Sequence, residues 1–73
     1  MHSIEYADDD YLENCKQMFA MVYPATAPRF VGIAQDKTSL IAECVSNEGT
    51  YYYRVTDDSV SRSFNNLEDA DRG

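Results

Sequence analysis

The sequence has few of the residues from which compact chemical sites are most often built. Its 73 residues include one histidine, two cysteines and three glycines, and no tryptophan. Structural zinc needs four ligands, usually Cys or His in close pairs, and His2, Cys15 and Cys44 are too few and too scattered to supply them. The glycines are also isolated from one another, so no glycine-rich loop is available to hold a phosphate group. The sequence therefore predicts no metal site and no cofactor site.

Basic residues are scarce as well. Six Lys and Arg stand against 13 Asp and Glu, which gives a net charge of −7. A chain of this charge repels phosphate backbones and anionic lipid surfaces, both of which are bound through clustered cations. We therefore expect no direct binding of nucleic acid and no binding to a membrane. The acidity then has two explanations: it keeps the protein in solution, or it attracts a basic surface on another protein.

Long apolar runs are missing too. No stretch has the length of a signal peptide or of a transmembrane helix, and the first five residues contain no Lys or Arg of an export signal. We therefore expect a cytoplasmic protein in which Cys15 and Cys44 are reduced core residues. Their separation along the chain does not decide whether they come close enough for a disulfide, so that alternative stays open.

The length of the chain limits its core. Residues 1–73 suffice for one small acidic domain, and a domain this short buries only about 60 % of the surface that its unfolded chain exposes. A partner chain can therefore supply part of its stability. Apolar residues make up 44 % of the sequence, and six tyrosines contribute much of this fraction. Tyrosine combines a large apolar ring with a polar tip, so it suits cores and interfaces equally.

One segment, residues 9–22, has the apolar spacing of an amphipathic helix. Its apolar side chains fall on a single stripe at helical intervals: Tyr11, Leu12, Cys15, Met18, Phe19 and Val22. Asp10 and Glu13 have the spacing of an acidic capping box, and acidic residues in a first turn suit the helix dipole. Pro24 cannot donate a backbone hydrogen bond and restricts the residue before it, so the helix ends ahead of it.

After residue 28 the apolar spacing changes to a period of two, which predicts β-strands. Four short strands follow with turn-length separators, at residues 29–34, 39–46, 50–56 and 59–64. The predicted fold class is α+β, with one amphipathic helix packed on an antiparallel meander sheet of four strands, or of five if residues 2–6 join it. Residues 66–73 are expected to be a frayed tail, with at most a helical turn capped by Asn65 or Asn66.

The turns between the predicted strands imply a register. A three-residue loop that ends in a left-handed Gly49 places Val45 opposite Tyr51 and Ile41 opposite Val55. With a two-residue turn at residues 57 and 58, one face holds the residues that should meet the helix: Ile41, Val45, Tyr51, Tyr53, Val55, Val60 and Phe64. The opposite face then carries a second apolar set: Leu40, Ala42, Cys44 and Tyr52. The strand over residues 39–46 is therefore either central with partial cover, or open to a partner on its outer side.

Two groups of residues are candidates for a chemical site. Asp8, Asp9 and Asp10 with Glu13 could hold a hard cation, but the alternating ligands and the sharp glycine turn of a calcium loop are absent. A cysteine nucleophile would need His2 as its base, and a chain end is a poor place for a positioned base. A solvated helix start and two core thiols explain these residues more simply. The sequence therefore predicts no catalytic residue and no enzymatic activity.

Two functions remain, and both are binding functions. In the first, the chain is a small acidic inhibitor that occupies a basic surface of a target protein, such as one that normally holds nucleic acid. Its composition resembles that of small phage and mobile-element inhibitors, including DNA mimics and anti-CRISPR proteins. The predicted partner-binding residues are six acids and one tyrosine: Asp8, Asp9, Asp10, Glu13, Asp57, Asp58 and Tyr52. In the second, the chain is a structural or accessory subunit that docks through its apolar outer sheet face; either function is compatible with a homo-oligomer.

Overall fold

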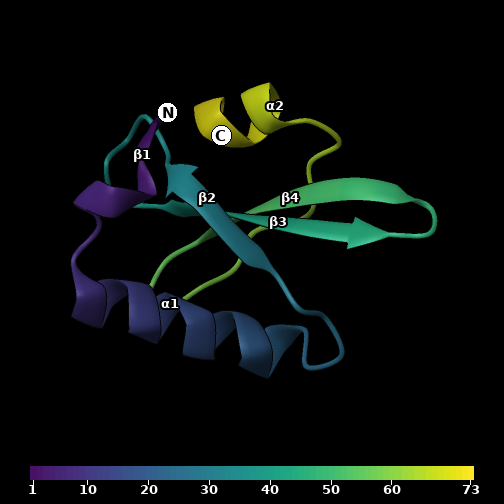
Figure 1. Ribbon diagram of the computed structural model, residues 1–73, viewed down its shortest axis with the longest axis horizontal. Helices are drawn as coiled ribbons and strands as arrows, with labels where there is room; N and C mark the ends of the chain where they lie inside the picture. The colour runs from purple at the N-terminus through teal and green to yellow at the C-terminus, as the bar shows by residue number, and fades with distance from the viewer.

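One long helix and one short helix lie on opposite faces of a four-stranded antiparallel sheet, as the computed structural model of residues 1–73 shows (Figure 1). The strands lie in the order of the sequence: β1 (His2–Ser3), β2 (Arg29–Ile33), β3 (Leu40–Ser46) and β4 (Gly49–Val55). The helices are α1 (Asp9–Val22) and α2 (Leu67–Arg72), and a 3-10 turn, η1 (Ile4–Tyr6), leads from β1 toward α1. The predicted α+β class with an antiparallel meander is confirmed.

Helix α1 has the bounds that its apolar stripe predicts, but its cap is different. Asp8 is the N-cap residue, and its carboxylate accepts hydrogen bonds from the backbone N–H groups of Asp10 (2.9 Å) and Tyr11 (3.2 Å). The predicted capping role of Asp10 is therefore wrong by two positions, because the chain is still extended at Asp8 and turns helical directly after it. Within the stripe, Cys15 and Phe19 are fully buried, whereas Val22 is exposed at the far end.

The predicted strand over residues 59–64 is wrong as a regular strand. This segment meets β4 at two isolated bridges, Val55 with Val60 and Tyr52 with Phe64. One extra residue lies between the bridges, and there the Ser61 hydroxyl accepts the N–H of residue 54 at 2.9 Å in place of a backbone carbonyl. The fourth strand of the sheet is β1, so the predicted strand over residues 2–6 shortens to two residues, followed by η1.

The register between β3 and β4 differs from the predicted one by one residue. The connecting loop holds two residues, so Ser46 lies opposite Gly49 and Ile41 opposite Arg54. Gly49 has a positive φ of 142°, as expected for a glycine at this turn. Because side chains alternate along a strand, a shift of one residue moves the whole of one strand to the other face relative to its partner.

The shift decides which residues of β3 meet α1. Leu40, Ala42 and Cys44 lie beneath α1, in a core cluster with four further buried residues: Cys15, Phe19, Ile33 and Val55. Ile41 lies on the opposite face, in a second cluster with Ala34, Phe64 and Ala70. Both faces of strand β3 are covered, which explains why its side chains are apolar on both sides. The predicted assignment of Ile41 to the helix face, and of Leu40, Ala42 and Cys44 to the outer face, is therefore wrong.

Residues 67–72 form α2 in place of the expected frayed tail. Asn66 caps this helix by accepting a hydrogen bond from the N–H of Asp69 at 2.9 Å, which confirms one of the two predicted caps. Ala70 is fully buried against the second cluster. A helix of six residues is too short to be stable by itself, so its packing against the sheet holds it in place.

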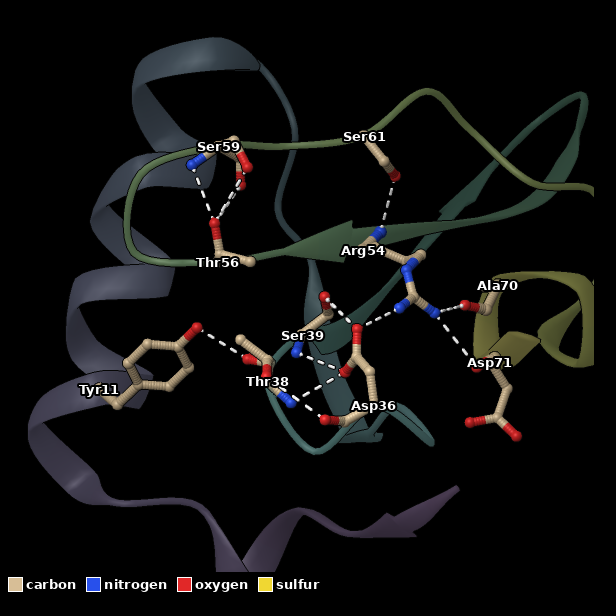
Figure 2. A network of polar contacts seen from close by, with 10 residues as sticks. All are labelled: Tyr11, Asp36, Thr38, Ser39, Arg54, Thr56, Ser59, Ser61, Ala70 and Asp71. Atoms are coloured by element: carbon tan, nitrogen blue, oxygen red, sulfur yellow. Dashed lines mark hydrogen bonds and ion pairs between the residues drawn. The ribbon is translucent and has the colours of Figure 1, made fainter. Parts of the chain in front are cut away.

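A polar network around Arg54 ties α2 to the sheet (Figure 2). The Arg54 guanidinium donates to the backbone carbonyls of Ala70 and Asp71, at the carboxyl end of α2, and pairs with the carboxylate of Asp36. Asp36 in turn accepts the N–H groups of Thr38 (2.8 Å) and Ser39 (2.9 Å). The arginine thus neutralises the negative end of the helix dipole and an acidic turn at the same time.

Neither helix is long and apolar enough to cross a membrane.

Candidate protein-binding surface

Six exposed carboxylates lie at the start of α1 and in the turn after β4. We call them the acidic surface: Asp8, Asp9, Asp10, Glu13, Asp57 and Asp58. Successive helical residues are about 100° apart, so Asp9, Asp10 and Glu13 share the side of α1 that faces away from Cys15 and the core. The turn is held by Thr56, whose hydroxyl donates to the Asp58 carboxylate at 2.8 Å.

The fold brings the Asp57 turn to α1, although more than thirty residues separate them along the chain. Figure 1 shows the loop after β4 reaching this helix. Burial, followed by the negative charges of Cys15 and Asp57, raises the pKa of Tyr11 to about 12. Burial also raises the pKa of Cys15 to about 11, again with a contribution from Asp57. Asp57 therefore lies near Tyr11 and Cys15, on the core-facing side of the first two turns of α1, whereas Asp9, Asp10 and Glu13 lie on the other side of that helix.

The carboxylates of the acidic surface are not neutralised within the protein. The three ion pairs join the Met1 amino group to Asp71, Arg54 to Asp36, and Arg72 to Glu68. None of them includes a residue of the acidic surface. The only cation on α1 is Lys16, which is exposed and forms no ion pair. The negative potential of this region is therefore free to act on a partner.

Tyr52, the one aromatic residue among the predicted partner contacts, lies elsewhere. It is half-buried at the margin of the second cluster, on the face that carries α2. Its hydroxyl donates to the Glu43 carboxylate at 3.2 Å, and burial together with this acidic neighbour raises its pKa. The sheet separates Tyr52 from the acidic surface, so the seven predicted residues do not form one patch.

The sulfur and histidine side chains are not arranged as a reactive centre. Cys15 and Cys44 are both free thiols in the core. Burial raises the pKa of each, which keeps them in the unreactive thiol form at neutral pH. His2 lies exposed on the edge strand β1. No group of three or more His, Cys, Asp or Glu side chains is placed to hold a metal ion.

The apolar face on which the accessory-subunit hypothesis depends is closed. Leu40, Ala42 and Cys44 have exposed fractions of 1 %, 0 % and 6 %, because α1 covers them. A partner could reach them only by displacing the main helix. The sequence pattern did not reveal this cover, since the expected register put these residues on the other side.

Comparisons with protein-family models, with curated proteins and with solved structures find no match for this chain. Its function is therefore argued from its own geometry and charge.

Proposed function

We propose that this protein is a non-enzymatic binding module, a small acidic inhibitor whose acidic surface occupies a basic surface of a target protein. The observation that carries the proposal is that two exposed acidic segments, at the start of α1 and at residues 57 and 58, flank the same helix and form no ion pair within the protein. A target surface that normally holds nucleic acid presents the clustered Arg and Lys that this region would attract.

Charge is expected to act on the rate of association more than on the strength of any single contact. An exposed ion pair contributes about 0–1 kcal/mol, so no one carboxylate dominates. Several carboxylates on one side of a chain with net charge −7 steer a basic partner over distances of about the Debye length, roughly 10 Å at 0.1 M salt. Binding by this surface should therefore weaken steeply as salt rises.

The test uses capture of proteins from the native host by the wild-type chain and by two charge variants. In one variant Asp8, Asp9 and Asp10 are changed to Asn, and in the other Asp57 and Asp58 are changed to Asn. Asn is as good a helix cap as Asp, so Asp8→Asn keeps the start of α1. The association rate and affinity of each captured protein are then measured at low and at high salt. We expect both variants to lose affinity roughly tenfold at low salt and to differ little from wild type at high salt.

A matched control is Glu48→Gln, which removes an exposed acid from the β3–β4 loop without touching the acidic surface. If Glu48→Gln reduces binding as much as the other variants do, net charge alone explains the attraction and the site assignment is wrong. If no captured protein binds more slowly to either Asp variant, the proposed function is wrong.

A further inference from the structure

A polar cleft lies on the α2 side of the protein, formed by residues 62–65 and the last turn of α2. Its volume is about 280 Å³, and its lining includes Arg62, Ser63, Asn65, Asp69 and Arg72. In a chain with six basic residues, two arginines share this one cleft. It belongs to neither the acidic surface nor the Arg54 network.

The backbone pairing at Phe64 leaves hydrogen-bond donors free around the cleft. Phe64 and Tyr52 exchange both of their backbone hydrogen bonds, at 2.7 and 2.9 Å. Residues on either side of such a pair direct their N–H groups away from the partner strand. Ser63 and Asn65 accordingly make no hydrogen bond within the protein through their backbone N–H groups or their side chains. Ser63 and Asn65 are both exposed, so they present two backbone N–H groups, a hydroxyl and a carboxamide that have no hydrogen-bond partner within the protein.

The charged groups of the cleft differ in the ion pairs and hydrogen bonds that they already form within the protein. The Arg62 guanidinium lies 4.8 Å from the centre of the Phe64 ring and forms no ion pair, so its N–H groups remain free. Arg72 pairs with Glu68, one turn back on α2, at the exposed surface. The Asp69 carboxylate, the acid of the lining, accepts a hydrogen bond from the Asn66 side chain at 3.1 Å. The cleft therefore presents one free guanidinium and a second that an exposed ion pair holds only weakly.

We propose that this cleft binds a phosphate group. Arginine is suited to phosphate because its planar fork donates two parallel hydrogen bonds to neighbouring oxygens. Backbone amides and a hydroxyl at the same lining can add further hydrogen bonds, which suits the several oxygens of a phosphate group better than the two of a carboxylate. The volume leaves room for a group of this size. The net charge of the chain opposes the binding, so the affinity should be modest.

The probe is inorganic phosphate, which replaces chloride stepwise at constant ionic strength. Binding is followed by NMR through the backbone amide signals of the wild-type protein. We expect saturable shifts at Ser63 and Asn65, with a Kd of about 1–10 mM for so small a ligand. Arg62→Gln should weaken the binding at least fivefold. Arg29→Gln is the matched control, because Arg29 is also exposed and free of ion pairs but lies on β2. Unchanged signals from α1 show that each variant is folded.

Three outcomes would overturn the proposal. The shifts at Ser63 and Asn65 could fail to saturate, they could persist in Arg62→Gln, or acetate could produce them at the same concentration as phosphate. None of these outcomes bears on the acidic surface, because the variants that test it leave the cleft intact. The two proposals therefore fail independently.

Discussion

The two faces of the sheet are stabilised in different ways. On the α1 face, seven buried residues form the larger cluster, and the rings of Phe19, Tyr23 and Tyr53 pack with centroids 5.0–5.3 Å apart. On the α2 face only four residues are buried together, and a six-residue helix covers them. The free energy gained by burying apolar surface is proportional to the area buried. The α2 face buries fewer apolar residues, so apolar packing stabilises its helix less.

On the α2 face, hydrogen bonds and ion pairs compensate for the smaller apolar cluster. Arg54 satisfies carbonyls at the end of α2 and the carboxylate of Asp36, while Asp71 accepts hydrogen bonds from the Met1 amino group and the Gln35 side chain, each at 3.0 Å. Hydrogen bonds to charged groups contribute more than neutral ones, but they depend on geometry and on protonation. The α1 face should therefore lose stability when side-chain volume is removed, and the α2 face when charge is removed.

Phe19→Ala should have the largest effect, because it removes a fully buried ring from the α1 face. We expect a loss of about 3–5 kcal/mol in the free energy of unfolding, measured by denaturant titration. Phe64→Ala is the matched change on the α2 face, where the ring lies at the edge of the cluster and is 8 % exposed. It should cost less than Phe19→Ala. Equal losses would mean that the two faces contribute alike.

Arg54→Met should destabilise the contacts of the α2 face alone. The substitution keeps an apolar side chain and removes every donor of the guanidinium, so we expect a loss of about 1–3 kcal/mol. Hydrogen exchange should accelerate at the Ala70 and Gly73 amides, which bond to Asn66 and Asp69 across α2. Exchange within α1 should change only as far as global stability does. Arg29→Met is the control, and the same acceleration in that variant would refute the role of Arg54.

Gly49→Val tests a position outside both faces. A Cβ atom added at Gly49 would meet no atom within 4 Å, so any cost comes from the backbone φ of 142° alone. A β-branched residue resists that conformation, and we expect a loss of roughly 1–2 kcal/mol in thermal unfolding. A variant as stable as wild type would show that the β3–β4 loop has another conformation.

The smallest expected effect is a pH dependence carried by Asp36. Burial alone would raise the pKa of Asp36, but hydrogen bonds from Ser39 and Thr38 and the charge of Arg54 outweigh it, so the pKa lies below its ordinary value of 3.8. A carboxyl group with a lowered pKa stabilises the folded state above its unfolded pKa, and the contribution is lost as pH falls through the folded value.

Asp36→Asn isolates this contribution, since Asn can still accept the two backbone N–H groups of the turn. The wild type should exceed the variant in stability by at most about 1 kcal/mol near neutral pH, because Asp36 is partly exposed. The difference should shrink below about pH 4. A constant difference from pH 7 to pH 2 would rule out the pairing with Arg54.

Local patterns predicted the elements better than their arrangement. The bounds of α1 follow from its apolar stripe and from Pro24, because both act within a few residues. Three of the predicted strands lie within one or two residues of β2, β3 and β4. The strand over residues 59–64 failed because alternation of side chains does not show whether a backbone ladder forms, and here Ser61 replaces one rung.

The candidate site was predicted in its parts and not in its assembly. The acids of the α1 start and of the Asp57 turn are visible in the sequence, and both are exposed in the structure. The approach of the Asp57 turn to α1 is not visible, because it depends on how the loop after β4 returns to that helix. Tyr52 lies on the face opposite α1, as the alternation within β4 predicts, so the sheet separates it from these acids. No short-range signal links Arg54 to Asp36 or to the end of α2.

The long helix, the alternating strands, an asparagine cap at residue 65 or 66 and the net charge of −7 could all be predicted from the amino-acid sequence. Each of these depends on propensity, spacing or composition, which act between near neighbours. Only the tertiary structure decided the strand register, the face on which Ile41 lies, and the contacts of Asp57 and Arg54 with distant segments. A strand that is apolar on both sides fits either register equally well locally, so the choice between registers depends on what covers each face.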